Sequence, residues 1–192
     1  MRNVRTWHSP LHSAFSTPHF TRDSAVTIDQ LVREYQLKPH PEGGFYKETY
    51  RSTEGIEREA LPGRFSGNRS FSTAILYLLP EGVKSRWHRI KSDELWHFHL
   101  GGPLVVEEVT PDGRLEKTVL GLGKDAKLQH AVTAGRWFRS YCQPGAGYSL
   151  VGCTVAPGFD FADFETIEPD DLLRLFPMLG SGDPPLRPAS PL

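Results

Sequence analysis

The sequence lacks three features that would place it in a common class of protein. Its 192 residues include only two cysteines, too few for a disulfide-stabilised scaffold. It contains no run of about 18 apolar residues, so no membrane-spanning helix is expected. Its 22 basic and 23 acidic residues nearly cancel, whereas electrostatically driven nucleic-acid binders carry a strong basic excess. We therefore expect a globular protein with neither a nucleic-acid nor a membrane partner.

Glycine and proline are abundant instead, at 18 and 16 residues. Most of the glycines fall between Gly43 and Gly158, where apolar and β-branched runs alternate with turn signals such as Pro111–Gly113. This spacing disfavours a helical bundle and predicts a β-sandwich or barrel. The expected strands are 45–51, 71–79, 95–100, 104–109, 118–120, 131–133 and 148–155.

A short helix is predicted on each side of this region. Thr27 can cap a helix whose apolar residues share one face up to Tyr35, before Pro39 ends it. Pro169–Phe176 begins with a proline and acidic residues, as helices often do. The predicted organisation is one domain over residues 26–178, with disordered tails at 1–25 and 179–192. We expect a cytoplasmic location, although the acid-free, arginine-bearing start weakly resembles an organelle transit peptide.

Residues 82–101 contain the densest cluster of chemically active side chains. His88, Glu94, His97 and His99 lie within 12 positions. Imidazole and carboxylate groups bind zinc, iron and manganese, and they also serve as general acids and bases. Strand alternation places Glu94 and Trp96 on one face together with Phe98, and the two later histidines on the other face. An aromatic face that holds one carboxylate indicates a binding pocket.

Other stretches have both a structural and a functional interpretation. Glu42 precedes two glycines, so it belongs either to a turn before an edge strand or to a ligand site. Alternation would place Lys47, Thr49 and Arg51 on one face, where the cations suit a phosphate or carboxylate. Pro157–Asp160 is either a β-turn or a lid over the barrel mouth. Ser85, Trp87 and Gln129 could line the pocket mouth, and Trp87 and Trp96 either stack on a sugar or base or pack in the core.

The central segment resembles the first motif of the cupin superfamily. Gly82, His88, Glu94 and Gly101 match that motif in register, but Ile90 replaces its second histidine. In the second motif Gly135 matches, whereas Thr133 replaces the proline and Phe138 the histidine. The resemblance therefore leaves two of the four usual metal ligands, His88 and Glu94. A divalent metal would need Gln129, His97 or His99 to complete its ligand set.

Over about residues 28–167 the sequence more closely resembles the cupin-5 family, a domain of unknown function. The matching motifs are His40–Tyr46, Ser85–His88, Asp93–Phe98 and Val155–Phe161. The resemblance implies a mainly β fold, a double-stranded β-helix or cupin jelly-roll barrel, with a pocket inside and a homodimeric assembly. Family members have been likened to sugar-nucleotide epimerases and sugar-phosphate isomerases, which is an analogy between folds.

We therefore expect a small-molecule-binding barrel that acts as an isomerase or epimerase on a sugar derivative. In this hypothesis His88 is the base, and Glu94 orients it or acts as the acid. The expected ligand contacts are Glu42, Thr49, Ser85, Trp87, Trp96, Phe98, Gln129 and Phe138. The alternatives are a non-catalytic metabolite-binding protein, favoured by the apolar Ile90 and Phe138, and a metal-dependent enzyme that uses His88 and Glu94 as ligands.

Overall fold

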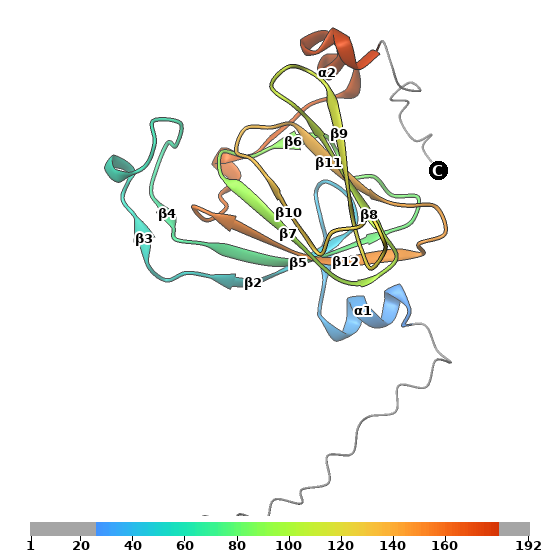
Figure 1. Ribbon diagram of the computed structural model, residues 1–192. Helices are drawn as coiled ribbons and strands as arrows, with labels where there is room; N and C mark the ends of the chain where they lie inside the picture. Colours follow the sequence, from blue (N-terminus) through green and yellow to red (C-terminus); the bar gives the residue numbers. More distant parts are fainter. Residues whose placement is uncertain (1–25, 181–192) are drawn as a thin grey trace, which may run out of the picture.

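The computed structural model describes residues 26–180, so the predicted tail at 1–25 and all but the first two residues of the predicted tail at 179–192 lie outside the described residues. Two antiparallel sheets form a double-stranded β-helix (Figure 1). The first sheet has the order β1 (Lys38–Pro39), β2 (Phe45–Arg51), β5 (Thr73–Pro80), β12 (Tyr148–Ala156), β7 (Asp93–Gly101) and β10 (Gln129–Val132). The second has the order β13 (Glu165–Thr166), β6 (His88–Arg89), β11 (Phe138–Cys142), β8 (Leu104–Val109) and β9 (Leu115–Leu120).

A small two-stranded arm extends from one side of this barrel (Figure 1). It consists of β3 (Gly55–Ile56), a 3₁₀ turn η1 (Arg58–Ala60) and β4 (Arg69–Ser70). The barrel core lies between the two sheets, where its apolar side chains pack together. Its buried members include Tyr77, Leu79, Trp96, Val106, Phe138 and Val151.

Both predicted helices are confirmed. α1 (Ile28–Glu34) starts at a capping box, in which the Thr27 side chain accepts from the Gln30 backbone and the Gln30 side chain accepts in return. Its Leu31 packs with Leu78 and Leu150 below the first sheet (Figure 1). α2 (Pro169–Leu175) covers the second sheet through Leu172, which packs with the cluster of Trp87, Val109 and Trp137.

After α2 the chain continues into a short 3₁₀ helix, η3 (Pro177–Gly180). Leu179 of this helix is buried against the same cluster. Packed structure therefore extends past residue 178, where the sequence predicted the domain to end.

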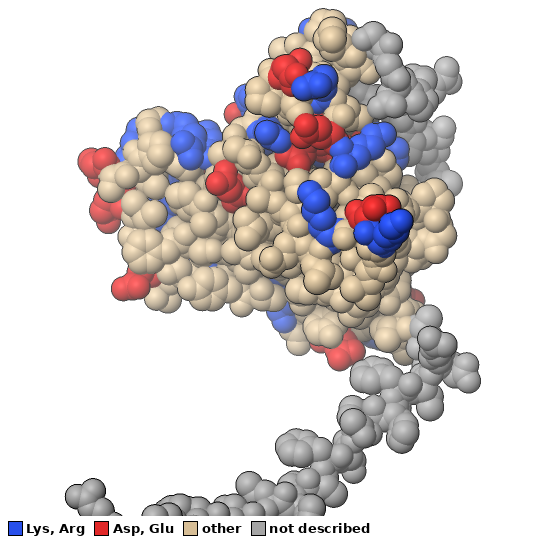
Figure 2. All heavy atoms as spheres, in the orientation of Figure 1, with Lys and Arg blue, Asp and Glu red and all other residues tan. Residues whose placement is uncertain are grey.

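None of the helices within residues 26–180 has the length and hydropathy needed to cross a bilayer. On the face drawn in Figure 2, cationic and anionic side chains are interspersed and separated by uncharged surface. This arrangement fits the balanced charge of the sequence.

The sequence did not predict β11, although it lies in the middle of the second sheet. The reason is that two consecutive polar residues, Arg139 and Ser140, occupy buried positions in it. Arg139 Nε donates to Glu107 at 2.6 Å, and its guanidinium lies 4.7 Å from the centre of the Trp87 ring. The Ser140 backbone amide donates to Ser85 Oγ at 2.8 Å. These internal pairs satisfy polar groups that would otherwise argue against burial.

A β-bulge in β2 changes which of its side chains face the barrel interior. Glu48 pairs with Ile75 while Tyr50 pairs with Ala74, so Thr49 is an extra residue. The inserted residue shifts the alternation, and Arg51 joins Tyr46 and Glu48 at the interior cavity. The prediction that Lys47, Thr49 and Arg51 share one face is therefore wrong.

Two motif glycines provide a matched test of backbone strain. Gly101 and Gly82 have φ angles of +96° and +83°, which strain any residue with a Cβ. A Cβ on Gly101 would lie 2.4 Å from the Tyr148 carbonyl oxygen, whereas one on Gly82 would meet nothing within 4 Å. We expect Gly82→Ala to lower the free energy of unfolding by about 1 kcal/mol and Gly101→Ala by about 3 kcal/mol, as measured by urea denaturation. Equal losses would contradict the predicted clash.

Candidate functional site

A cavity of about 320 Å³ lies inside the barrel, enclosed by the first sheet, β6 and the segment that follows β12. Its buried part, here called the floor, consists of Glu42, Tyr77, His88, Ile90, Glu94, Trp96 and Cys153. Its solvent-exposed part, here called the rim, consists of Glu48, Arg51, Asp160 and Phe161. His40, Tyr46, Phe159 and Phe164 line the walls between them. The cavity thus places acid–base groups below a partly aromatic wall.

His88 is fixed in one tautomer by the backbone. Its Nδ1 lies 2.8 Å from the Arg86 carbonyl oxygen, and only a protonated nitrogen can donate to that acceptor. Burial lowers the pKa of His88 to about 4, so the ring is neutral at pH 7 and Nε2 carries the lone pair. The ring packs against Phe138, with 4.0 Å between ring centroids. His88 therefore has the form that a general base requires.

Glu42 lies in the turn between β1 and β2, and its side chain points toward His88. Its Oε2 lies 3.3 Å from His88 Nδ1, and its backbone amide donates to His40 Nδ1 at 3.2 Å. Burial, followed by the negative charge of Glu94, raises the pKa of Glu42 well above its ordinary value. Burial also lowers the pKa of His40 to about 4. His40 is therefore neutral at pH 7, and burial favours the neutral form of Glu42.

Glu94 projects into the cavity from β7 and is 8% exposed. Burial raises its pKa to about 7, and a hydrogen bond with Cys153 lowers it slightly. A carboxyl group that titrates near neutral pH can both donate and accept a proton under physiological conditions. The sequence analysis assigned Glu94 either to orient His88 or to act as the acid. In the structure, the groups beside His88 Nδ1 are the Glu42 carboxyl and the Arg86 carbonyl.

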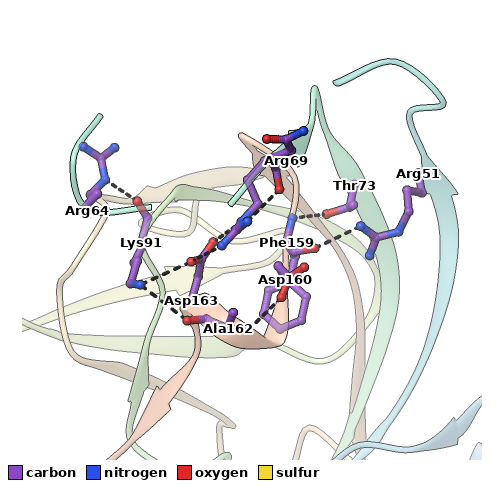
Figure 3. A network of polar contacts seen from close by, with 10 residues as sticks. Arg51, Arg64, Arg69, Thr73, Lys91, Phe159, Asp160, Ala162 and Asp163 are labelled. Carbon is purple, nitrogen blue, oxygen red and sulfur yellow. Dashed lines mark hydrogen bonds and ion pairs between the residues drawn. The ribbon is translucent and has the colours of Figure 1, made fainter. Parts of the chain in front are cut away.

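The segment after β12 covers the cavity and is held by polar contacts at both ends (Figure 3). The Phe159 amide donates to Thr73 Oγ1 at 3.0 Å, and its carbonyl accepts from Arg51 Nη1 at 3.1 Å. Asp163 forms a bidentate, buried ion pair with Arg69 of the arm, at 2.6 Å for each contact. The stretch interpreted as either a turn or a lid thus lies over the cavity and is fastened there.

Glu42, His88, Glu94 and Trp96 are the sequence-predicted site residues that line the cavity. Phe138 lies behind His88 and is fully buried. The other predicted contacts lie elsewhere. Ser85 is buried beside Ser140, Trp87 packs under α2, Phe98 packs on the barrel core, Thr49 donates to the Ala74 carbonyl, and Gln129 is exposed beside His97.

Side-chain direction explains these differences. Ser85 and Trp87 both precede β6 and point toward the second sheet, away from the cavity. The sequence also missed His40, Tyr77 and Cys153. His40 adjoins Glu42 within a recognised motif, which was an available signal, but Tyr77 and Cys153 lie in apolar strands that resemble ordinary core.

The resemblance to cupins implies four metal ligands, of which this chain keeps His88 and Glu94. Ile90 occupies the second histidine position at the cavity floor and Phe138 replaces the fourth ligand; neither side chain can coordinate. His97 and Gln129, which would have to complete the set, hydrogen-bond each other on the opposite face of β7 and β10. In the described part of the chain, no cluster of three His, Cys, Asp or Glu residues is arranged to hold a metal ion. The residues present do not fit a metal centre.

Comparison with known proteins agrees with the fold. The Cupin_5 family, described as Cupin superfamily (DUF985), matches residues 29–167. An uncharacterized protein of Saccharomyces cerevisiae is 31% identical over 159 residues, which cover 77% of this chain and 79% of that protein. A solved structure from Shewanella oneidensis is 36% identical with a TM-score of 0.69, and covers 78% of this chain and 90% of its own. A hypothetical protein from Leishmania major is 32% identical with a TM-score of 0.71, and covers 79% and 93%.

The raised pKa of Glu94 predicts a pH-dependent effect of Glu94→Gln on stability. Between its ordinary value of 4.5 and about 7, the folded protein keeps a proton that the unfolded chain has lost. This linkage lowers the stability of the wild type as pH rises through that window. Relative to the wild type, Glu94→Gln should gain up to roughly 3 kcal/mol in unfolding free energy from pH 4.5 to 7. Urea denaturation across this pH range measures the unfolding free energy of each protein. Glu34→Gln, on the exposed face of α1, is the control. The prediction fails if the unfolding free energies of Glu94→Gln and the wild type change in parallel with pH.

The Arg69–Asp163 ion pair predicts a large stability loss on removal of one partner. Both side chains are almost fully buried, so Asp163→Ala leaves an unpaired guanidinium inside the protein. We expect a loss of about 3–5 kcal/mol in chemical denaturation. Lys91 contacts the same carboxylate at 3.5 Å but is 28% exposed, so Lys91→Met should cost about 1 kcal/mol or less. Similar losses in the two variants would show that burial of the pair is unimportant.

Proposed function

Because this chain belongs to the Cupin_5 (DUF985) family of the cupin superfamily, we propose that its barrel binds a small molecule and transfers protons on it. The proposed reaction is an isomerisation or epimerisation of a carbohydrate derivative. The observation that carries this proposal is the presence of His88 and Glu94 in one cavity, with His88 held as the Nδ1–H tautomer. Fold alone would not select this activity, because cupin barrels serve many functions.

Isomerisation next to a carbonyl needs one group that removes a proton from carbon and another that protonates the carbonyl oxygen. His88 Nε2 is the proposed base, since Nδ1 is committed to the Arg86 carbonyl. Glu94 is the proposed acid, because its pKa of about 7 leaves a large protonated fraction at neutral pH. His88 then donates the proton it holds to the former carbonyl carbon, and the Glu94 carboxylate accepts a proton from the hydroxyl on the carbon that lost its hydrogen. That hydroxyl becomes the new carbonyl, and both side chains are regenerated.

The shape and lining of the cavity support a small cyclic ligand. A volume of about 320 Å³ is at the small end of ligand pockets. Tyr46, Tyr77, Trp96 and Phe164 offer ring faces or edges on which the C–H surface of a sugar can pack. The alternative is a non-catalytic metabolite-binding barrel, and the apolar Ile90 and Phe138 at former histidine positions favour it.

Proton exchange in D₂O tests the proposed activity. The wild type would be incubated with a panel of monosaccharides and monosaccharide phosphates, and deuterium on carbon measured by mass spectrometry. We expect exchange on at least one panel member, and a loss of about 100-fold or more in both His88→Ala and Glu94→Gln. Gln129→Ala, which lies outside the cavity, should leave the rate unchanged.

Circular dichroism would establish that each variant is folded before rates are compared. A folded His88→Ala protein with the wild-type exchange rate would rule out His88 as the base. A panel member that binds the wild type at the cavity without ever exchanging a proton would support the non-catalytic alternative instead.

A further inference from the structure

Arg51 is the only cationic residue among the described residues that line the cavity, and three of its five N–H groups are already engaged. Its Nε and Nη2 donate to the two Glu48 carboxylate oxygens at 3.0 and 2.7 Å. Its Nη1 donates to the Phe159 carbonyl at 3.1 Å. This bidentate pair occupies the Nε side of the guanidinium and pairs its charge. An anionic ligand would have to compete with Glu48 for Arg51.

The neighbouring cations are engaged as well (Figure 3). Arg69 forms the buried pair with Asp163, and Lys91 contacts both Asp163 and the Ala162 carbonyl. Arg64 donates to the Lys91 carbonyl at 2.6 Å and does not line the cavity. Each of these three cations would have to break an existing contact to turn toward a ligand at the rim.

Carboxyl groups outnumber cations along the cavity wall. Glu48 and Asp160 lie at the rim, and Glu42 and Glu94 lie in the floor. Asp160 accepts from the Ala162 amide at 2.8 Å and has an exposed side chain at the mouth. An incoming anion would meet these rim carboxylates before a floor that holds two more carboxyl groups, and near two histidines whose pKa values burial lowers to about 4. Like charges in a partly desolvated cavity repel more strongly than in water.

We propose that the cavity selects an uncharged ligand with a ring and hydroxyl or carbonyl groups, and rejects ligands that carry phosphate or carboxylate. This inference rests on the proposed function, in that it takes the cavity as the ligand site, but it narrows the substrate class. The acid and imidazole groups of the floor match hydroxyl and carbonyl partners, and the aromatic walls match a ring. The sequence had suggested instead that Arg51 would favour a phosphate or carboxylate.

Benzamide and benzoate test this selectivity, because they share one shape and differ in charge. Their binding would be measured at pH 7 by ligand-observed NMR at millimolar concentrations, with competition between them to show a shared site. We expect benzamide to bind the wild type at least about tenfold more tightly than benzoate, a difference of about 1.4 kcal/mol. Equal affinities, tighter binding of benzoate, or no binding of benzamide would overturn the proposal.

Two variants test whether the Arg51–Glu48 pair sets the preference. Glu48→Gln removes one rim carboxylate and releases Arg51, so benzoate affinity should rise about tenfold while benzamide affinity stays constant. Adding Arg51→Gln to this variant should abolish the gain, because the released cation is gone. Unchanged benzoate affinity in Glu48→Gln would refute the role of the pair. None of these readouts needs turnover, so a failure of proton exchange and a failure of charge selection are separate results.

Discussion

Desolvation of the cavity floor is the constraint on which the rest of the site depends. The barrel closes around two carboxyl groups and two imidazoles that water would otherwise hydrate. Burial lowers the pKa of His40 and His88 to about 4 and raises the pKa of Glu94 to about 7. Each group therefore favours its neutral form, because a buried charge without a partner costs several kcal/mol. The desolvation that destabilises the folded protein also leaves His88 neutral with a free lone pair, and it makes Glu94 titrate near neutral pH.

The surrounding structure compensates for this polar floor with local hydrogen bonds and with ion pairs placed outside the cavity. The Arg86 carbonyl accepts from His88 Nδ1 and fixes the ring. The Arg86 amide donates to the Glu42 carbonyl at 3.1 Å, so the same residue also holds the turn that carries Glu42. Outside the cavity, the buried Arg69–Asp163 pair joins the arm to the segment after β12 that covers the cavity. The cavity is thus held by contacts that do not bring a free cation into it, which connects its architecture to the proposed preference for uncharged ligands.

Much of the fold could be predicted because it follows from local pattern. Alternating runs located β2 and β8 at their observed bounds, and Thr27 marked the start of α1. The prediction of a double-stranded β-helix came from the resemblance to cupins, and the family match over residues 29–167 confirms that resemblance. β11 was missed because Arg139 and Ser140 are satisfied by partners elsewhere in the chain, which no local pattern reveals. The homodimer and the cytoplasmic location stay predictions.

For the site, the sequence by itself determined which chemical groups are present, namely His88 and Glu94 within a motif, with Ile90 and Phe138 in place of further ligands. Only the tertiary structure decided which of them meet. Glu42, distant in sequence, lies beside His88, while Ser85, Trp87 and Gln129 face elsewhere. A single inserted residue in β2 turned Arg51 toward the cavity and against Glu48. Residue type fixes what chemistry a side chain offers, but its protonation and direction depend on burial and strand register, which distant parts of the chain create.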